Sequence, residues 1–186
     1  MPQPDAASLV AALRPPARVY FEPVGVLRDC MAGSTLRLSL LTPTAYDLPL
    51  GEIVAGILLN WIPVPSPLRF SIATVVDEAT INAIVHGNLA ISSRCRGSVA
   101  GLGHLDRQLA SRLADPAACA KRCDIRIRWN QSHIFLRVSD EGHGFTFQDS
   151  SDSAAAHGRG RSIIRALTAT HRWVRGGRTL ALKLAR

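Results

Sequence analysis

Lysine is almost absent from this sequence, and so are the patterns that mark several classes of protein. The chain has 22 basic residues, of which only Lys121 and Lys183 are lysines, and its net charge is +8. It contains no basic stripe interleaved with aromatic residues and no zinc-finger spacing, so we expect no nucleic-acid binding. The arginine excess is consistent with an acidic partner or a phosphate-rich ligand, although a solvated basic surface explains most of it.

Long hydrophobic runs are missing as well. The longest, Ile53 to Ile62, is interrupted by Asn60 and followed by prolines, which makes it too short to cross a bilayer. The apolar stretch at residues 9–13 is followed by Arg14-Pro15-Pro16 rather than by a signal-peptidase site. We therefore expect no membrane association and a cytoplasmic location.

Paired cysteines are the third absence. The four cysteines, at positions 30, 95, 119 and 123, include no Cys-x2-Cys pair, which argues against a zinc site. Cys119 and Cys123 are four residues apart in a helix-like stretch, so we predict two small buried side chains on one helix face. Reduced thiols fit a cytoplasmic protein.

The length and composition that remain are those of one globular domain. The 186 residues are 47% hydrophobic and 19% charged, which favours a single core. Residues 1–30 are punctuated by prolines and are interpreted as an N-terminal arm with one strand at residues 18–21. Residues 31–186 are predicted to form the domain.

Hydrophobic periodicity predicts alternating helices and strands along that domain. Residues 88–122 are less regular and are interpreted as an insertion, and residues 146–157 form a polar segment interpreted as a mobile loop. The expected strands are 35–40, 124–129 and 134–138 with a final hairpin turning at residues 176–177, and the expected helices are 50–61, 69–86, 105–113 and 161–170.

The helix at residues 69–86 carries the first chemical motif. Glu78, Asn82 and His86 recur every four residues, so they share nearly one helix face. An Asn oxygen can ligate a hard cation such as Mg²⁺, and a Glu can accept a proton from an attacking hydroxyl group. Taken alone, the pattern is more typical of an amphipathic helix with solvated polar residues, because Glu and Asn are common on helix surfaces.

A second motif, Asp140-x-Gly142-x-Gly144, follows directly after a strand. The two glycines allow a sharp turn and a close approach of the backbone to a flat ligand. The Asp140 carboxylate can accept a hydrogen bond from an exocyclic amine. A simple turn with Asp at its start is the alternative.

The third motif, Gly158-Arg159-Gly160, opens a helix. Exposed amides at a helix N-terminus bind phosphate oxygens, and Arg159 can add positive charge. On its own, a Gly-x-Gly pair is also typical of a flexible hinge.

In this order and at these positions, the three motifs resemble the N, G1 and G2 boxes of the histidine-kinase-like ATPase superfamily. Within it, the run from Glu78 to Asn88, Glu-x3-Asn-Ala-x2-His-Gly-Asn, is most similar to the anti-sigma-factor serine/threonine kinases of the RsbW and SpoIIAB type. The resemblance covers residues 35 to 186. It implies a Bergerat fold, which is a two-layer α/β (α+β) sandwich whose mixed, mostly antiparallel sheet is backed by helices.

The resemblance also implies roles for single residues. Glu78 would be the general base and Asn82 the Mg²⁺ ligand, with His86 in the same box. Asp140 would contact the adenine amino group. The implied nucleotide contacts are completed by Gly142 and Gly144 beneath the adenine, Gly158, Arg159 and Gly160 at the phosphates beyond a lid at 146–157, and Thr179 near the adenine.

Two departures from the family pattern stand out. Arg161 occupies the position after the second lid glycine, where relatives have Leu. Arg178 follows Gly177 where several members have Thr, so Thr179 is proposed as its substitute.

Two hypotheses about function follow. In the first, the protein transfers the γ-phosphoryl group of ATP to a Ser or Thr of an anti-anti-sigma (STAS-domain) partner and sequesters a sigma-like factor, with a PP2C-like phosphatase in the same pathway and homodimerisation implied by the family. In the second, the protein is a nucleotide-gated binding module with little or no kinase activity. The presence of Glu78 favours the enzyme, because a pure binder needs no base there.

Overall fold

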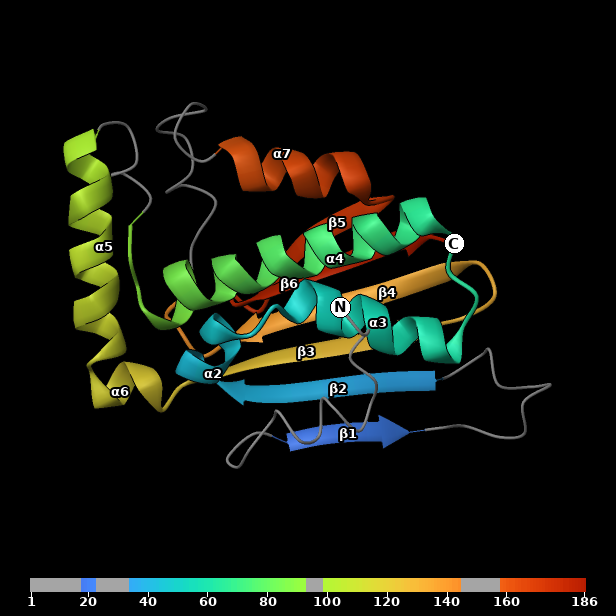
Figure 1. The fold of residues 1–186 in the computed structure, drawn as a ribbon, viewed down its shortest axis with the longest axis horizontal. Coiled ribbons are helices and arrows are strands. Elements are labelled where there is room, and N and C mark those ends of the chain that lie inside the picture. The colour runs from blue at the N-terminus through green and yellow to red at the C-terminus, as the bar shows by residue number, and fades with distance from the viewer. Residues whose placement is uncertain (1–17, 23–33, 93–98, 145–157) are drawn as a thin grey trace.

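In the computed structural model, residues 18–22, 34–92, 99–144 and 158–186 are described. They form one six-stranded sheet with helices packed against one of its faces (Figure 1). The strands are β1 (Arg18–Glu22), β2 (Ser34–Leu41), β3 (Arg122–Trp129), β4 (His133–Asp140), β5 (Thr170–Val174) and β6 (Thr179–Ala185). The helices are α2 (Thr42–Asp47), α3 (Leu50–Trp61), α4 (Ser66–Ile81), the π-helix η1 (Asn82–Asn88), α5 (Val99–Leu113), α6 (Pro116–Cys119) and α7 (Gly158–Leu167).

The strand order is β1-β2-β3-β4-β6-β5, and every pair of neighbours among the described strands is antiparallel. Side chains alternate between a buried and an exposed face, as β3 shows with Cys123, Ile125, Ile127 and Trp129 turned into the core. The predicted class, a mixed α and β sandwich with a mostly antiparallel sheet, is confirmed at this level.

Between the sheet and its helices lies the hydrophobic core. Leu36, Leu38 and Leu40 of β2 are buried there beside the apolar face of α3. Trp61 at the end of α3 meets Trp129 of β3 edge to face, with ring centroids 5.9 Å apart. These contacts hold the helical layer onto the sheet.

Most predicted elements are confirmed, with shifts at their ends. Helix α3 and the β3–β4 and β5–β6 hairpins lie where the patterns place them. Helix α4 begins at Ser66, three residues before the predicted start, because Pro67 lies in its first turn, where a missing N–H costs no helical hydrogen bond. The expected continuous helix to His86 instead changes to a π-helix at Asn82. The short helices α2 and α6 were not predicted.

The prediction for the two cysteines is wrong. Cys119 ends the short helix α6 and Cys123 lies in β3, so they do not share a helix face. Asp115 caps α6 by accepting a hydrogen bond from the Ala117 amide at 2.9 Å, and the chain then turns into the strand. Cys123 is fully buried, and burial raises the pKa of its thiol.

Part of the expected N-terminal arm belongs to the sheet, because β1 pairs with β2 along its whole length. The expected insertion contains α5 and α6, and the expected lid at 146–157 lies outside the described residues. No helix within the described part of the chain combines the length and the apolar character that a membrane crossing requires.

Helices α3 and α4 approach closely at Gly51, which gives a test of the packing. A Cβ atom at Gly51 would collide with the backbone oxygen of Ala73, and the Gly51 amide donates a hydrogen bond to Asp77 Oδ1 at 2.7 Å. We expect Gly51→Ala to lower the free energy of unfolding by about 2 kcal/mol or more, because two helix backbones must separate.

Gly103 supplies the matched control. It lies in α5, and an added Cβ would meet nothing within 4 Å. Gly103→Ala should raise stability by about 0.5–1 kcal/mol in urea denaturation, since Ala restricts the unfolded chain. Equal effects of the two substitutions would contradict the close approach of α3 and α4.

Candidate functional site

The first motif lies where α4 gives way to the π-helix η1. Glu78 lies in the last turn of α4, and Asn82 begins η1, its amide directed at the carbonyl oxygens of both Glu78 and Ala79. Single π-helical turns often occur at functional sites, because they redirect side chains without ending the helix. Here the π-turn carries the chain past Asn82 towards the end of β4.

Asn88 joins η1 to the strands. Its side chain is fully buried and donates to Thr42 Oγ1 at 3.0 Å and to the Arg122 carbonyl oxygen at 3.1 Å. Its Oδ1 accepts the amide of Glu141 at 2.9 Å, just beyond β4. This one carboxamide therefore holds the first motif against the second. The sequence motif includes Asn88, but no local pattern indicates this role for it.

Gly87 and Gly142 allow the two chain segments to touch at the same junction. A Cβ atom at Gly142 would collide with the carbonyl group of Gly87, and a Cβ atom at Gly87 would collide with the Asp140 side chain. Only backbone fits at either position. The glycines of the first and second motifs are therefore required because two chain segments touch.

Asp140 is the ionisable group of this junction. Its Oδ1 accepts the Gly142 amide at 2.9 Å, and its carboxyl group is largely buried beside Gly87. Burial raises the pKa of Asp140 to about 6, although the Gly142 hydrogen bond and the charges of Arg178 and Lys121 act in the opposite direction. The second carboxylate oxygen is not used by Gly142 and can accept another donor.

The third motif packs directly on the first. Gly160 lies in the first turn of α7, and a Cβ atom there would be 2.5 Å from Glu78 Oε2 and 3.9 Å from Asn82 Nδ2. Asn82 Nδ2 is buried and has no hydrogen-bond partner among the described residues. A buried amide nitrogen without a partner is costly, which marks this point as a place where a polar ligand would fit.

Gly144 closes the far side of the second motif. Its φ angle is +74°, which favours glycine, and a Cβ atom there would collide with the carbonyl oxygen of Gly176. The end of β4 is thereby held against the β5–β6 hairpin.

The structure does not bring two of the predicted residues into this arrangement. His86 Nδ1 lies 2.6 Å from the carbonyl oxygen of Ile91, so its ring contacts its own loop. Thr179 Oγ1 lies 2.9 Å from Ser139 Oγ, its partner in register. Successive strand residues point to opposite faces, so the Thr179 hydroxyl lies on the face opposite the Asp140 carboxyl group.

The other two predicted residues of the third motif, Gly158 and Arg159, lie at the start of α7. Gly158 begins α7, two residues before Gly160, and therefore lies in the turn that faces Glu78. Arg159 lies between them, and its side chain is outside the described residues.

Comparisons with protein-family models and with curated proteins identify no relative of this chain.

Asp140 gives a test that does not depend on any ligand. Its pKa of about 6 in the folded protein exceeds the ordinary 3.8, so between these values the folded state holds more protons than the unfolded chain. The protonated Asp140 carboxyl group therefore contributes fully to the free energy of unfolding below about pH 4. This contribution is lost as the pH rises through 6. Asp140→Asn removes this loss and can still accept the Gly142 hydrogen bond.

We expect Asp140→Asn to be more stable than the wild type at neutral pH, with the difference shrinking as the pH falls towards 4. Urea denaturation at a series of pH values measures it. Asp106→Asn, at an exposed position on α5, is the control for exchanging a carboxylate for an amide outside the junction. A pH-independent difference for Asp140→Asn would show that the carboxyl group is not held in a raised-pKa environment.

Proposed function

We propose that this protein binds Mg²⁺-ATP in a Bergerat-type site and transfers the γ-phosphoryl group to a Ser or Thr of an anti-anti-sigma, STAS-domain partner. The observation that carries the proposal is the convergence of three motifs separated by up to 82 residues in sequence, from Glu78 to Gly160. Gly160 packs on Glu78, and Gly142 packs on Gly87. Three unrelated turns and caps would have no reason to meet at one junction.

The end of the site at β4 suits an adenine ring. Asp140 keeps one carboxylate oxygen on the Gly142 amide and has the other available for an exocyclic amine. Gly87 and Gly142 carry no side chains and touch each other, so they form a backbone wall beside the Asp140 carboxyl group. Partial burial of the carboxyl group strengthens a hydrogen bond made to it.

The end of the site at α7 suits phosphate groups. The first amides of α7 have no partners within the helix, and the buried Asn82 amide lies beside them. No three His, Cys, Asp or Glu side chains in the described residues form a metal cluster. Magnesium would therefore depend on the Asn82 oxygen, phosphate oxygens and water, a ligand set that Mg²⁺ commonly takes with nucleotides, and when bound it would neutralise charge on the transferred group.

Glu78 is the residue proposed to accept the proton of the attacking hydroxyl group. It lies one helical turn before Asn82, close to the phosphate end of the site. A base there would orient the partner's Ser or Thr for transfer. By resemblance, the same partner exchange would release or sequester a sigma-like factor, and a PP2C-like phosphatase would reverse the modification.

One observation favours the second candidate, a nucleotide-gated binding module. Gly160 packs against the Glu78 carboxylate, where a Cβ atom would lie 2.5 Å from Oε2, so the start of α7 occupies part of the space that an attacking hydroxyl group would need. A nucleotide that displaces α7 could change a partner surface without any transfer. Both candidate functions use the ATP site. They differ in whether Glu78 accepts a proton from a Ser or Thr hydroxyl group of a partner protein.

Nucleotide binding is tested first, by calorimetry. In Asp140→Asn the single amide oxygen stays on the Gly142 amide, and the NH₂ group then faces the adenine amine, donor against donor. We expect ATP affinity to fall by about tenfold or more, and Asn82→Ala to weaken Mg²⁺-ATP binding similarly. Glu52→Gln should bind as the wild type does. Unchanged affinity in both site variants would refute the assignment.

Phosphoryl transfer is tested with radiolabelled ATP, Mg²⁺ and the STAS-domain protein encoded nearest to this chain. Glu78→Gln should reduce labelling of Ser or Thr by about 10²–10⁴-fold, because a positioned base contributes that much. ATP affinity should change little. Glu52→Gln is again the matched control. If the wild type binds ATP and labels nothing, the gated module is the correct candidate.

A further inference from the structure

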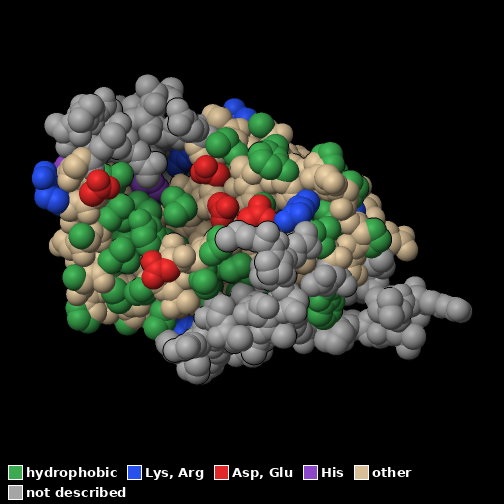
Figure 2. Space-filling view, in the orientation of Figure 1, with side chains coloured by type: hydrophobic (Ala, Val, Ile, Leu, Met, Phe, Trp, Pro, Cys, Tyr) green, Lys and Arg blue, Asp and Glu red, His purple; other side chains and the backbone are tan. Residues whose placement is uncertain are grey.

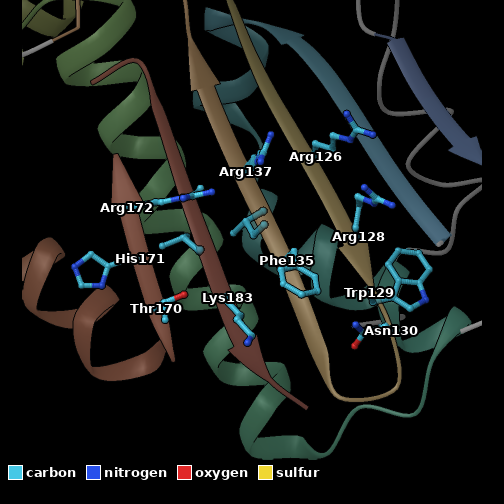
Figure 3. A pocket seen from close by; sticks show the side chains of 13 residues that line it. Arg126, Arg128, Trp129, Asn130, Phe135, Arg137, Thr170, His171, Arg172 and Lys183 are labelled. Atoms are coloured by element: carbon cyan, nitrogen blue, oxygen red, sulfur yellow. The ribbon is translucent and has the colours of Figure 1, made fainter. Parts of the chain in front are cut away.

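The sheet face away from the helices carries a groove that the proposed ATP site does not use. It has a volume of about 920 Å³ and lies over β3, β4, β6 and β5 (Figure 3). Cationic and neutral side chains line it, and none of the described lining residues is acidic: Arg126, Arg128, Trp129, Asn130, Phe135, Leu136, Arg137, Thr170, His171, Arg172, Ala181, Leu182 and Lys183.

Register places three of the lining arginines, Arg126, Arg137 and Arg172, in one line across the strands, and Arg37 of β2 continues this line beyond the groove. The paired positions run from β2 to β5 as Arg37, Arg126, Arg137, Ala181 and Arg172. Neighbouring strands are about 4.8 Å apart, so the line spans roughly 19 Å. The small side chain of Ala181 leaves an opening between two of the arginines.

The next line along the strands forms an apolar floor edged by charge. Arg128 is paired with Phe135, which is paired in turn with Lys183. The Phe135 ring is 39% exposed, and Lys183 Nζ lies 6.0 Å from its centroid. Together with the arginine methylene groups, this ring offers contact area to a partner as well as positive potential.

The exposed cations of the groove have no acidic neighbour among its described lining residues. Arg128, Arg137 and Arg172 are exposed, and Lys183 is half-buried. The opposite face of the molecule shows acidic and basic side chains interspersed with apolar ones (Figure 2). The described lining of the groove, by contrast, has cations and no carboxylate, and a partner with negative charge would complement it.

We infer that this groove, defined by the arginine line and the Phe135 floor, is a docking surface for an acidic segment of a partner protein. A second copy of the chain is a poor occupant, because a face-to-face pair would set arginine lines against each other. Single-stranded nucleic acid usually stacks on several aromatic rings, whereas of the Phe and Trp residues in the described lining of the groove Phe135 is exposed and Trp129 is buried. The inference is independent of ATP binding.

The experiment uses the full chain and a fluorescein-labelled Glu-rich peptide containing leucines, followed by fluorescence anisotropy. Arg137→Ser/Arg172→Ser removes two charges from the arginine line. Arg107→Ser/Arg165→Ser removes two exposed charges from α5 and α7 and leaves the same net charge. We expect about a tenfold loss of affinity in the first variant and about a twofold loss or less in the second.

A second variant guards against a folding defect. Ala181→Glu places a carboxylate in the floor of the groove without removing any arginine, and it should abolish peptide binding while urea denaturation shows a folded protein. A version of the peptide with Lys in place of Glu should not bind the wild type.

Four results would overturn the inference. The peptide could fail to bind the wild type, or the two double variants could lose affinity equally, which would indicate diffuse attraction to a basic protein. An oligo-dT strand could bind more tightly than the peptide and respond to the arginine-line variant, which would make the groove a nucleic-acid surface. Light scattering could show a wild-type dimer that this variant dissociates, which would make the groove an interface between copies.

Discussion

The close contact between Gly87 and Gly142 is the constraint on which the rest of the site depends. It brings the end of η1 against the residues after β4, so that a helix and a strand from distant parts of the chain form one junction. The buried side chain of Asn88 then fixes the distance with three hydrogen bonds. Any side chain at either glycine would separate the two segments, and Asp140 would lose both its burial and its neighbours. The arrangement therefore depends on backbone contact, which tolerates less variation than contact between side chains.

Much of the fold could be predicted from the sequence, because its elements are stabilised locally. The strands β3 and β4 alternate strictly and are joined by a short turn, and α3 is bounded by prolines, so periodicity and turn chemistry indicated both. The π-helix could not be predicted in this way, because it arises where Asn82 to Asn88 must meet β4, a tertiary requirement. The cysteine prediction was wrong for a similar reason. A spacing of four is typical of a helix face, but Asp115 and Pro116 start a single turn that the strand then replaces.

In the candidate site, too, some residues could be predicted from local sequence patterns and others could not. Glu78, Asn82, Asp140 and the glycines of the second and third motifs were named from short local patterns, and the structure brings those motifs together. Asn88 was overlooked, since a buried Asn following His-Gly has no local signature of its three partners. Thr179 was proposed by position, and its pairing with Ser139 directs it to the other sheet face. Which face a strand residue occupies follows from register, and a one-residue difference reverses it.

The two charged regions of this molecule lie on opposite faces of the same sheet. Asp140 is a carboxyl group held where burial disfavours its ionised form, and Arg137 and Arg172 are exposed cations in a groove whose described lining has no carboxylate. Each region therefore presents a charged group that a bound partner of complementary chemistry would stabilise. An amine donor would use the free oxygen of Asp140, and carboxylates would neutralise the arginine line. Because the sheet separates the two regions, a partner docked on the groove would not contact the Asp140 junction directly.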